Sequence, residues 1–77
     1  MTTTTNGPTT TIIAGYDAQL ATLRTALRTA QERFRYRARK GLDTIETEYA
    51  IAHLTMTRGR LRRQRAFYMQ CLAEFGY

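Results

Sequence analysis

The sequence predicts an all-α protein: an antiparallel two-helix hairpin with an extended threonine-rich N-terminal arm, assembling into oligomeric helical bundles. Apolar residues recur at helical spacing on both sides of Gly41, a residue type that often ends helices. The chain has 77 residues, and so short a hairpin buries little surface by itself. The single Cys71 cannot form an internal disulfide, so oligomerisation or binding to a larger scaffold is the remaining source of stability.

Residues 1–11 form a low-complexity segment that contains seven threonines and the run Asn6-Gly7-Pro8. β-branched residues beside glycine and proline predict that no helix begins here. Two states fit this composition. The segment is either a disordered tail or an extended arm that lies across a neighbouring subunit.

The first helix is expected over about 16–40, because its apolar residues are spaced alternately four and three apart. This stripe consists of Tyr16, Leu20, Leu23, Leu27, Ala30 and Phe34. Asp17 is the candidate N-cap. Ile12 and Ile13 lie near the same stripe, so an earlier start is possible.

The turn is expected at 41–42 and the second helix over about 43–75, within a helical region that spans 12–77. Asp43 and Glu46 have the spacing of a capping box. So short a connection requires the two helices to run antiparallel. Gly59 costs about 1 kcal/mol inside a helix, and a break there would give three helices instead.

The second helix carries two apolar stripes that lie more than about 90° apart around its axis. One stripe consists of Ile45, Tyr49, Ala52, Met56 and Phe67. The other consists of Leu54, Leu61, Tyr68, Leu72 and Phe75. One partner helix covers only one stripe, and we assign the second set to a homo-oligomer interface.

The net charge of +6 and the pI near 10.3 favour an acidic partner such as nucleic acid. The first basic block, 33–40, is followed by acidic residues at 43–48, so we expect ion pairs across the turn. The second basic block, 58–65, lacks such a group of acidic neighbours. The predicted phosphate-binding residues are therefore Arg24, Arg28, Arg58, Arg60, Arg62, Arg63 and Arg65. The alternative is a charged face that is merely solvated.

No enzymatic signature is present in the sequence, and we expect no catalytic residue, metal or cofactor. A lone His53 and a lone Cys71 do not make a zinc ligand set. No apolar run of about 18 residues is present, so we expect no membrane span. The N-terminus has no basic residues followed by an apolar core, so we expect no signal peptide.

Charge and patterning together favour a structural assembly protein, a small virion or coat component that contacts nucleic-acid phosphates without sequence specificity. Its partners would be further copies of itself and DNA or RNA, within the virion. The alternative is a small cytoplasmic regulatory protein, a hairpin dimer that binds DNA or RNA as a four-helix bundle. A third class is a protein-interaction subunit or a basic helix lying on an anionic membrane.

Overall fold

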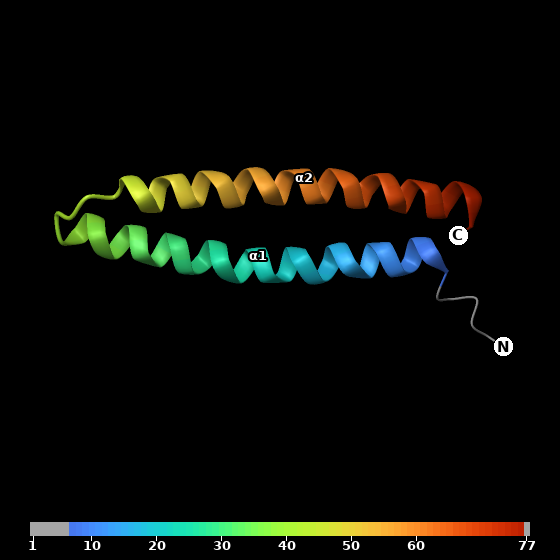
Figure 1. Cartoon of the computed structure of the whole chain (residues 1–77), viewed down its shortest axis with the longest axis horizontal. Coiled ribbons are helices and arrows are strands. Elements are labelled where there is room, and N and C mark those ends of the chain that lie inside the picture. The colour runs from blue at the N-terminus through green and yellow to red at the C-terminus, as the bar shows by residue number, and fades with distance from the viewer. Residues whose placement is uncertain (1–6, 77) are drawn as a thin grey trace.

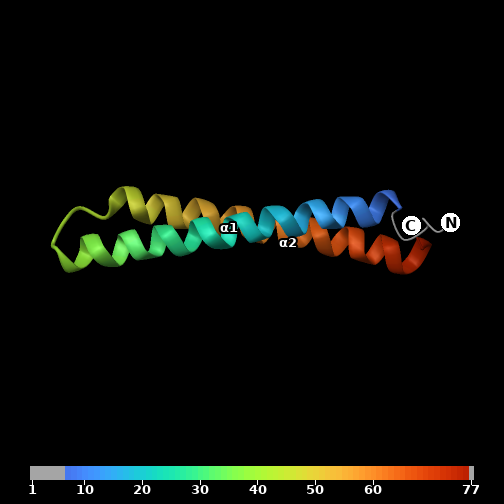
Figure 2. The same cartoon turned by 90° about the horizontal axis from the view of Figure 1, so that it is seen from below.

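The computed structural model describes residues 7–76 as two long antiparallel helices, α1 (Pro8–Arg39) and α2 (Ile45–Phe75), shown in Figure 1. The predicted all-α hairpin is thus confirmed over this part of the chain. The molecule is a thin rod whose extents are 59 × 21 × 12 Å. Seen from below, the helices cross near mid-length (Figure 2), as supercoiled helices do.

The first helix begins much earlier than the sequence predicts. Pro8 occupies its first turn and Gly7, in an extended conformation, is the N-cap. Proline suits this place because its fixed φ is helical and its missing N–H would lack an intrahelical partner anyway. The prediction of a non-helical arm is therefore wrong for Pro8–Thr11, and residues 1–6 lie outside the described part. Asp17 is an interior residue of α1 and not its N-cap.

The end of α1 confirms Gly41 as the residue that stops the helix. Its φ is +74°, in the left-handed region that glycine adopts without steric cost. The Gly41 N–H donates to the Ala38 carbonyl at 3.2 Å, and the Leu42 N–H donates to the Arg37 carbonyl at 2.8 Å. These two bonds form a Schellman motif, which satisfies carbonyls that the helix leaves open.

The start of α2 lies two residues after the predicted one, with Thr44 as the N-cap. Asp43 accepts a hydrogen bond from the Ile45 N–H through Oδ1 at 3.0 Å. The predicted capping box is not formed, since the Thr44 hydroxyl donates to the carboxylate of Glu48 and Glu46 takes no part. Both glutamates still lie in the first turn of α2, where the helix dipole favours negative charge.

The second helix is continuous through Gly59 and ends at Phe75, as the sequence predicts. Gly76 follows with a φ of +77° and donates its N–H to the Leu72 carbonyl at 2.8 Å. The alternative of a break at Gly59 is therefore excluded. Because α1 starts at Pro8, the two helices are nearly equal in length, with 32 and 31 residues.

The contact between the helices follows the predicted stripe of α1, where Leu27 and Ala30 are buried. On α2 the structure reverses our assignment of the two stripes. Leu61 is buried against α1, and Leu54, Tyr68 and Leu72 are half-buried in the same seam. Since only α1 is available to cover them, these residues hold the hairpin together and are wrongly assigned to an interface between copies.

The exposed stripe of α2 is the other one. Tyr49 is 74% exposed and Met56 is 75% exposed, and Ile45 and Phe67 are also largely open to solvent. Phe75, which we assigned to the oligomer interface, is 63% exposed near the open end of the hairpin. The apolar surface that remains available to a partner therefore lies on the outer face of α2.

The core of the hairpin is thin. Within residues 7–76, the buried set is Thr9, Ile13, Leu27, Ala30 and Leu61, and no side chain there is less than 2% exposed. One row of partly covered side chains stabilises a fold weakly, because burial of apolar area is the main favourable term. The hairpin by itself therefore buries little apolar area.

Candidate polyanion-binding surface

Arg24, Arg58 and Arg62 converge from both helices on one hollow beside the helix seam. Arg24 projects from α1, whereas Arg58 and Arg62 project from α2 on adjacent turns. Arg58 occupies a half-buried seam position, which restricts its side chain, and the other two arginines are exposed. Leu20 and Ala21 are the apolar residues among those that line the hollow.

The one carboxylate that lines this hollow belongs to Asp17, and it is already engaged. Arg65 Nε donates to Asp17 Oδ1 at 2.6 Å, and Nη2 lies 3.5 Å from Oδ2. Within residues 7–76 this is the only ion pair. Arg65, which we predicted to face a polyanion, instead uses its charge to join the two helices near their open end.

The other predicted arginines lie around the hollow or away from it. Arg28 is exposed one turn along α1 from Arg24, so it extends the basic surface. Arg60 projects from a different side of α2, since two residues correspond to about 200° of rotation. The Arg63 guanidinium lies over Gly59, 3.5 Å from where a Cβ would stand. Only part of the predicted set therefore lies at one place.

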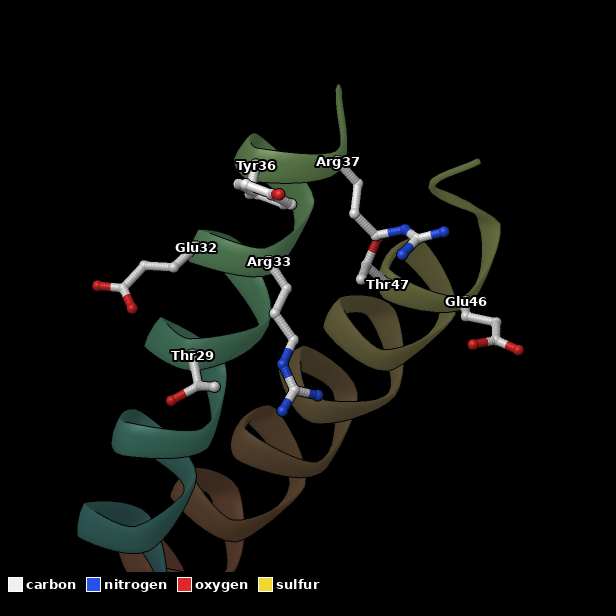
Figure 3. A pocket seen from close by; sticks show the side chains of 7 residues that line it. All are labelled: Thr29, Glu32, Arg33, Tyr36, Arg37, Glu46 and Thr47. Carbon is white, nitrogen blue, oxygen red and sulfur yellow. The ribbon is translucent and has the colours of Figure 1, made fainter. Parts of the chain in front are cut away.

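The first arginine block lies at the turn end of the hairpin, around a second hollow shown in Figure 3. The predicted ion pairs with the acidic residues of α2 are absent among the described residues. In Figure 3 the carboxylates of Glu32 and Glu46 point away from Arg33. Arg37 Nε donates instead to the backbone carbonyl of Asp43 at 2.6 Å. The expectation that this block is neutralised is thus wrong.

Positive charge thus occurs at the turn end as well as at mid-length, whereas residues 8–23 and 66–76, at the open end, contain no lysine or arginine. The turn end keeps exposed cations at Arg33, Arg35 and Arg39, and the Lys40 ammonium stands 5.9 Å from the centre of the Tyr36 ring. Sequence reasoning missed these as binding candidates, because proximity in sequence to acidic residues does not set the direction of a side chain. No sequence signal would have given that direction.

The spacing of α2 does contain a signal for the half-buried arginines. Arg58 and Arg65 are seven residues apart and alternate with Leu54, Leu61 and Tyr68 at steps of four and three. That series is a heptad seam, and it would have placed both arginines beside α1. Long arginine stems can cover apolar surface while the guanidinium reaches solvent.

The described part of the chain shows neither a metal site nor a membrane-spanning helix. Residues 7–76 hold no cluster of three side chains that could bind a metal ion. Neither α1 nor α2 is long and apolar enough to cross a membrane. No family model, no curated protein and no solved structure matches this chain. The charge arrangement is therefore the main guide to function.

Proposed function

We propose that this chain is a structural assembly protein whose hairpins pack together and contact nucleic-acid phosphates without reading sequence. The observation that carries the proposal is the convergence of Arg24, Arg58 and Arg62 on one hollow. Their guanidinium groups can each grip a phosphate through paired hydrogen bonds. Contacts to phosphates fix position but carry no sequence information.

The assembly half of the proposal is supported by what the hairpin leaves uncovered. Tyr49 and Met56 are about three-quarters exposed, while the core between the helices is one row deep. Large exposed apolar side chains usually mark contact surfaces. When many copies assemble, their arginines together form an extended basic surface. Such a surface suits a small coat component of a virion.

A matched pair of triple variants tests the phosphate-binding hollow. We expect the Arg24→Gln, Arg58→Gln, Arg62→Gln protein to bind duplex DNA more weakly. The slope of log affinity against log salt should fall by about 0.9 for each phosphate that the variant no longer neutralises. The control is Arg33→Gln, Arg35→Gln, Arg39→Gln, which removes the same charge at the turn end. Fluorescence anisotropy at several salt concentrations measures both, and circular dichroism checks that the helices persist.

The comparison separates a site from a general charge effect. A larger drop in affinity for the hollow variant supports binding at that place. Equal drops in the two variants would show that net charge alone attracts the nucleic acid, and would overturn the assignment of the hollow.

Light scattering and negative-stain microscopy test the assembly role. We expect particles much larger than a dimer when the protein is mixed with nucleic acid at high concentration. A discrete dimer under all conditions, with and without nucleic acid, would contradict the coat role and favour the regulatory hairpin dimer.

A further inference from the structure

The outer face of α2 carries a second series of residues at steps of four and three, opposite the seam with α1. In the half of α2 nearest the turn it consists of Ile45, Tyr49, Ala52, Met56, Gly59 and Arg63. All but Gly59 are exposed, and Gly59 is half-buried. Such spacing is typical of a helix that packs against another helix along a coiled-coil seam. The described chain has only two helices, so this second seam has no occupant.

We propose that a second copy of this chain packs antiparallel on the outer face of α2, in a two-fold register that places Met56 against Ala52 and Tyr49 against Gly59 of the second copy. The proposal rests on the self-association part of the proposed function and adds the surface and the register of the contact. In an antiparallel pair, the two kinds of seam position meet across the interface, and a two-fold axis makes each contact occur twice.

Side-chain size supports this register. The large residues Tyr49 and Met56 occupy one kind of seam position, and the small residues Ala52 and Gly59 occupy the other. Pairing large with small lets helices interdigitate at close distance. Gly59 costs helix stability by itself, but its missing side chain leaves room for an aromatic ring. The Arg63 guanidinium lies over Gly59 in the single hairpin, and in the pair it would move aside and stack on that ring.

Charge complementarity selects the same register. The seam is flanked by Glu46 and Glu48 near the start of α2 and by Arg60 and Arg62 two heptads later. In the proposed pair, Glu46 faces Arg60 and Glu48 faces Arg62 of the second copy, at the positions where coiled coils form interhelical ion pairs. None of these four residues makes an ion pair within residues 7–76.

Other antiparallel registers do not keep this match. A shift of one heptad towards the C-terminus sets Glu46 against Phe67 and Glu48 against Met69. A further heptad sets Arg60 against its own symmetry mate, which is repulsive. The opposite shift moves both arginines beyond the facing helix.

A parallel pair also fails to match the charges. It would set Glu48 beside His53 and Arg62 beside Phe67. The acidic starts of both helices would then lie side by side, which adds repulsion. The antiparallel register is therefore the one that the exposed charges favour.

A charge exchange tests the pairing. Glu46→Arg and Arg60→Glu should each weaken the dimer by roughly tenfold or more, as each replaces two attractive pairs by two repulsive ones. The double exchange should restore most of the wild-type dissociation constant, measured by analytical ultracentrifugation. Both positions are exposed, so the hairpin itself should survive, with circular dichroism as the check. Failure of the double variant to recover would overturn the proposed register.

Cysteine crosslinking tests the geometry independently, in a Cys71→Ser background. Thr55→Cys, beside the two-fold axis, should crosslink between copies with a short bifunctional maleimide. Ala73→Cys is the matched control, since it is exposed but its symmetry mate would lie roughly 57 Å away along the pair at 1.5 Å per residue. Crosslinking at both positions would indicate a parallel pair and contradict the proposal.

These results are separable from those for nucleic-acid binding. Arg62 serves both proposals, since it lines the hollow and faces Glu48 in the pair. The charge exchange therefore uses Glu46 and Arg60, which do not line the hollow. A monomeric wild-type protein at high concentration would overturn this inference and leave phosphate binding to be judged by the arginine variants.

Discussion

At the level of single residues, the Asp17 carboxylate links the stability of the hairpin to the charge of the hollow. It accepts the 2.6 Å hydrogen bond from Arg65 and also lines the space among the three converging arginines. The Asp17 side chain is 53% exposed and that of Arg65 is 34% exposed. Solvent therefore screens the pair, and its contribution to stability is at most about 1 kcal/mol.

Asp17→Asn should lower the free energy of unfolding by less than about 1 kcal/mol at low salt, with the difference shrinking at high salt. The same change should raise the affinity for DNA, because it removes the carboxylate that opposes bound phosphate. Urea unfolding and anisotropy measure the two effects. Glu32→Gln is the control, since Glu32 makes no ion pair in the described chain. A fall in DNA affinity for Asp17→Asn would contradict the assignment of the hollow.

At the level of elements, two glycines with different backbone conformations shape the helices. Gly41 has a φ of +74° and allows the chain to leave α1 and turn back. Gly59 lies in the uninterrupted interior of α2, where the helix tolerates it. The neighbouring sequence does not show which glycine ends a helix and which lies inside one, because Gly59 would also fit a helix end.

Alanine substitutions at these glycines should have opposite effects on the isolated hairpin. Gly41→Ala should destabilise it by about 1 kcal/mol, because the left-handed conformation strains a residue with a Cβ. Gly59→Ala should stabilise α2 by up to about 1 kcal/mol, since the added Cβ would stand 3.5 Å from Arg63 Nη1, an ordinary contact.

Thermal unfolding of dilute protein, followed by circular dichroism, measures both changes. Gly76→Ala is a useful comparison for Gly41→Ala, because Gly76 also has a positive φ but lies at the end of α2. A stable Gly41→Ala protein would show that the turn has another conformation open to it.

At the level of the whole molecule, a rod only 12 Å thick in its shortest dimension has little interior. Two helices bury one seam, and the outer face of α2 keeps Ile45, Tyr49 and Met56 in water. We therefore expect stability to depend on contacts between molecules, as it does for many small domains.

The midpoint of thermal unfolding should rise with protein concentration, since association stabilises the folded state by mass action. Circular dichroism melts at widely separated concentrations measure this dependence. The Glu46→Arg variant should show a weaker dependence than the wild type. A midpoint that does not change with concentration in either protein would show that the single hairpin is sufficient by itself.

Much of the hairpin follows from the sequence because local rules set it. The spacing from Tyr16 to Phe34 defines the buried face of α1, and Gly41 marks the turn. The start of α1 at Pro8 does not follow from the composition of this segment, because its threonines disfavour a helix although Pro8 suits a first turn. Proline at the first turn favours the start of a helix, whereas threonine in the interior disfavours the helix. The apolar stripe continues towards the N-terminus and favours the longer helix.

Tertiary structure alone decided which side of α2 faces inward and which arginines are free. Both stripes of α2 have helical spacing, but the one with Leu54, Leu61 and Tyr68 is covered by α1, and bulky residues gain more from burial than alanine and glycine do. Arg65 meets Asp17 across a separation of 48 residues in sequence. The sequence determined two helices and their charge, because propensity and periodicity are local. The pairing of faces and charges was decided only when the helices packed, because it depends on their relative rotation and axial register.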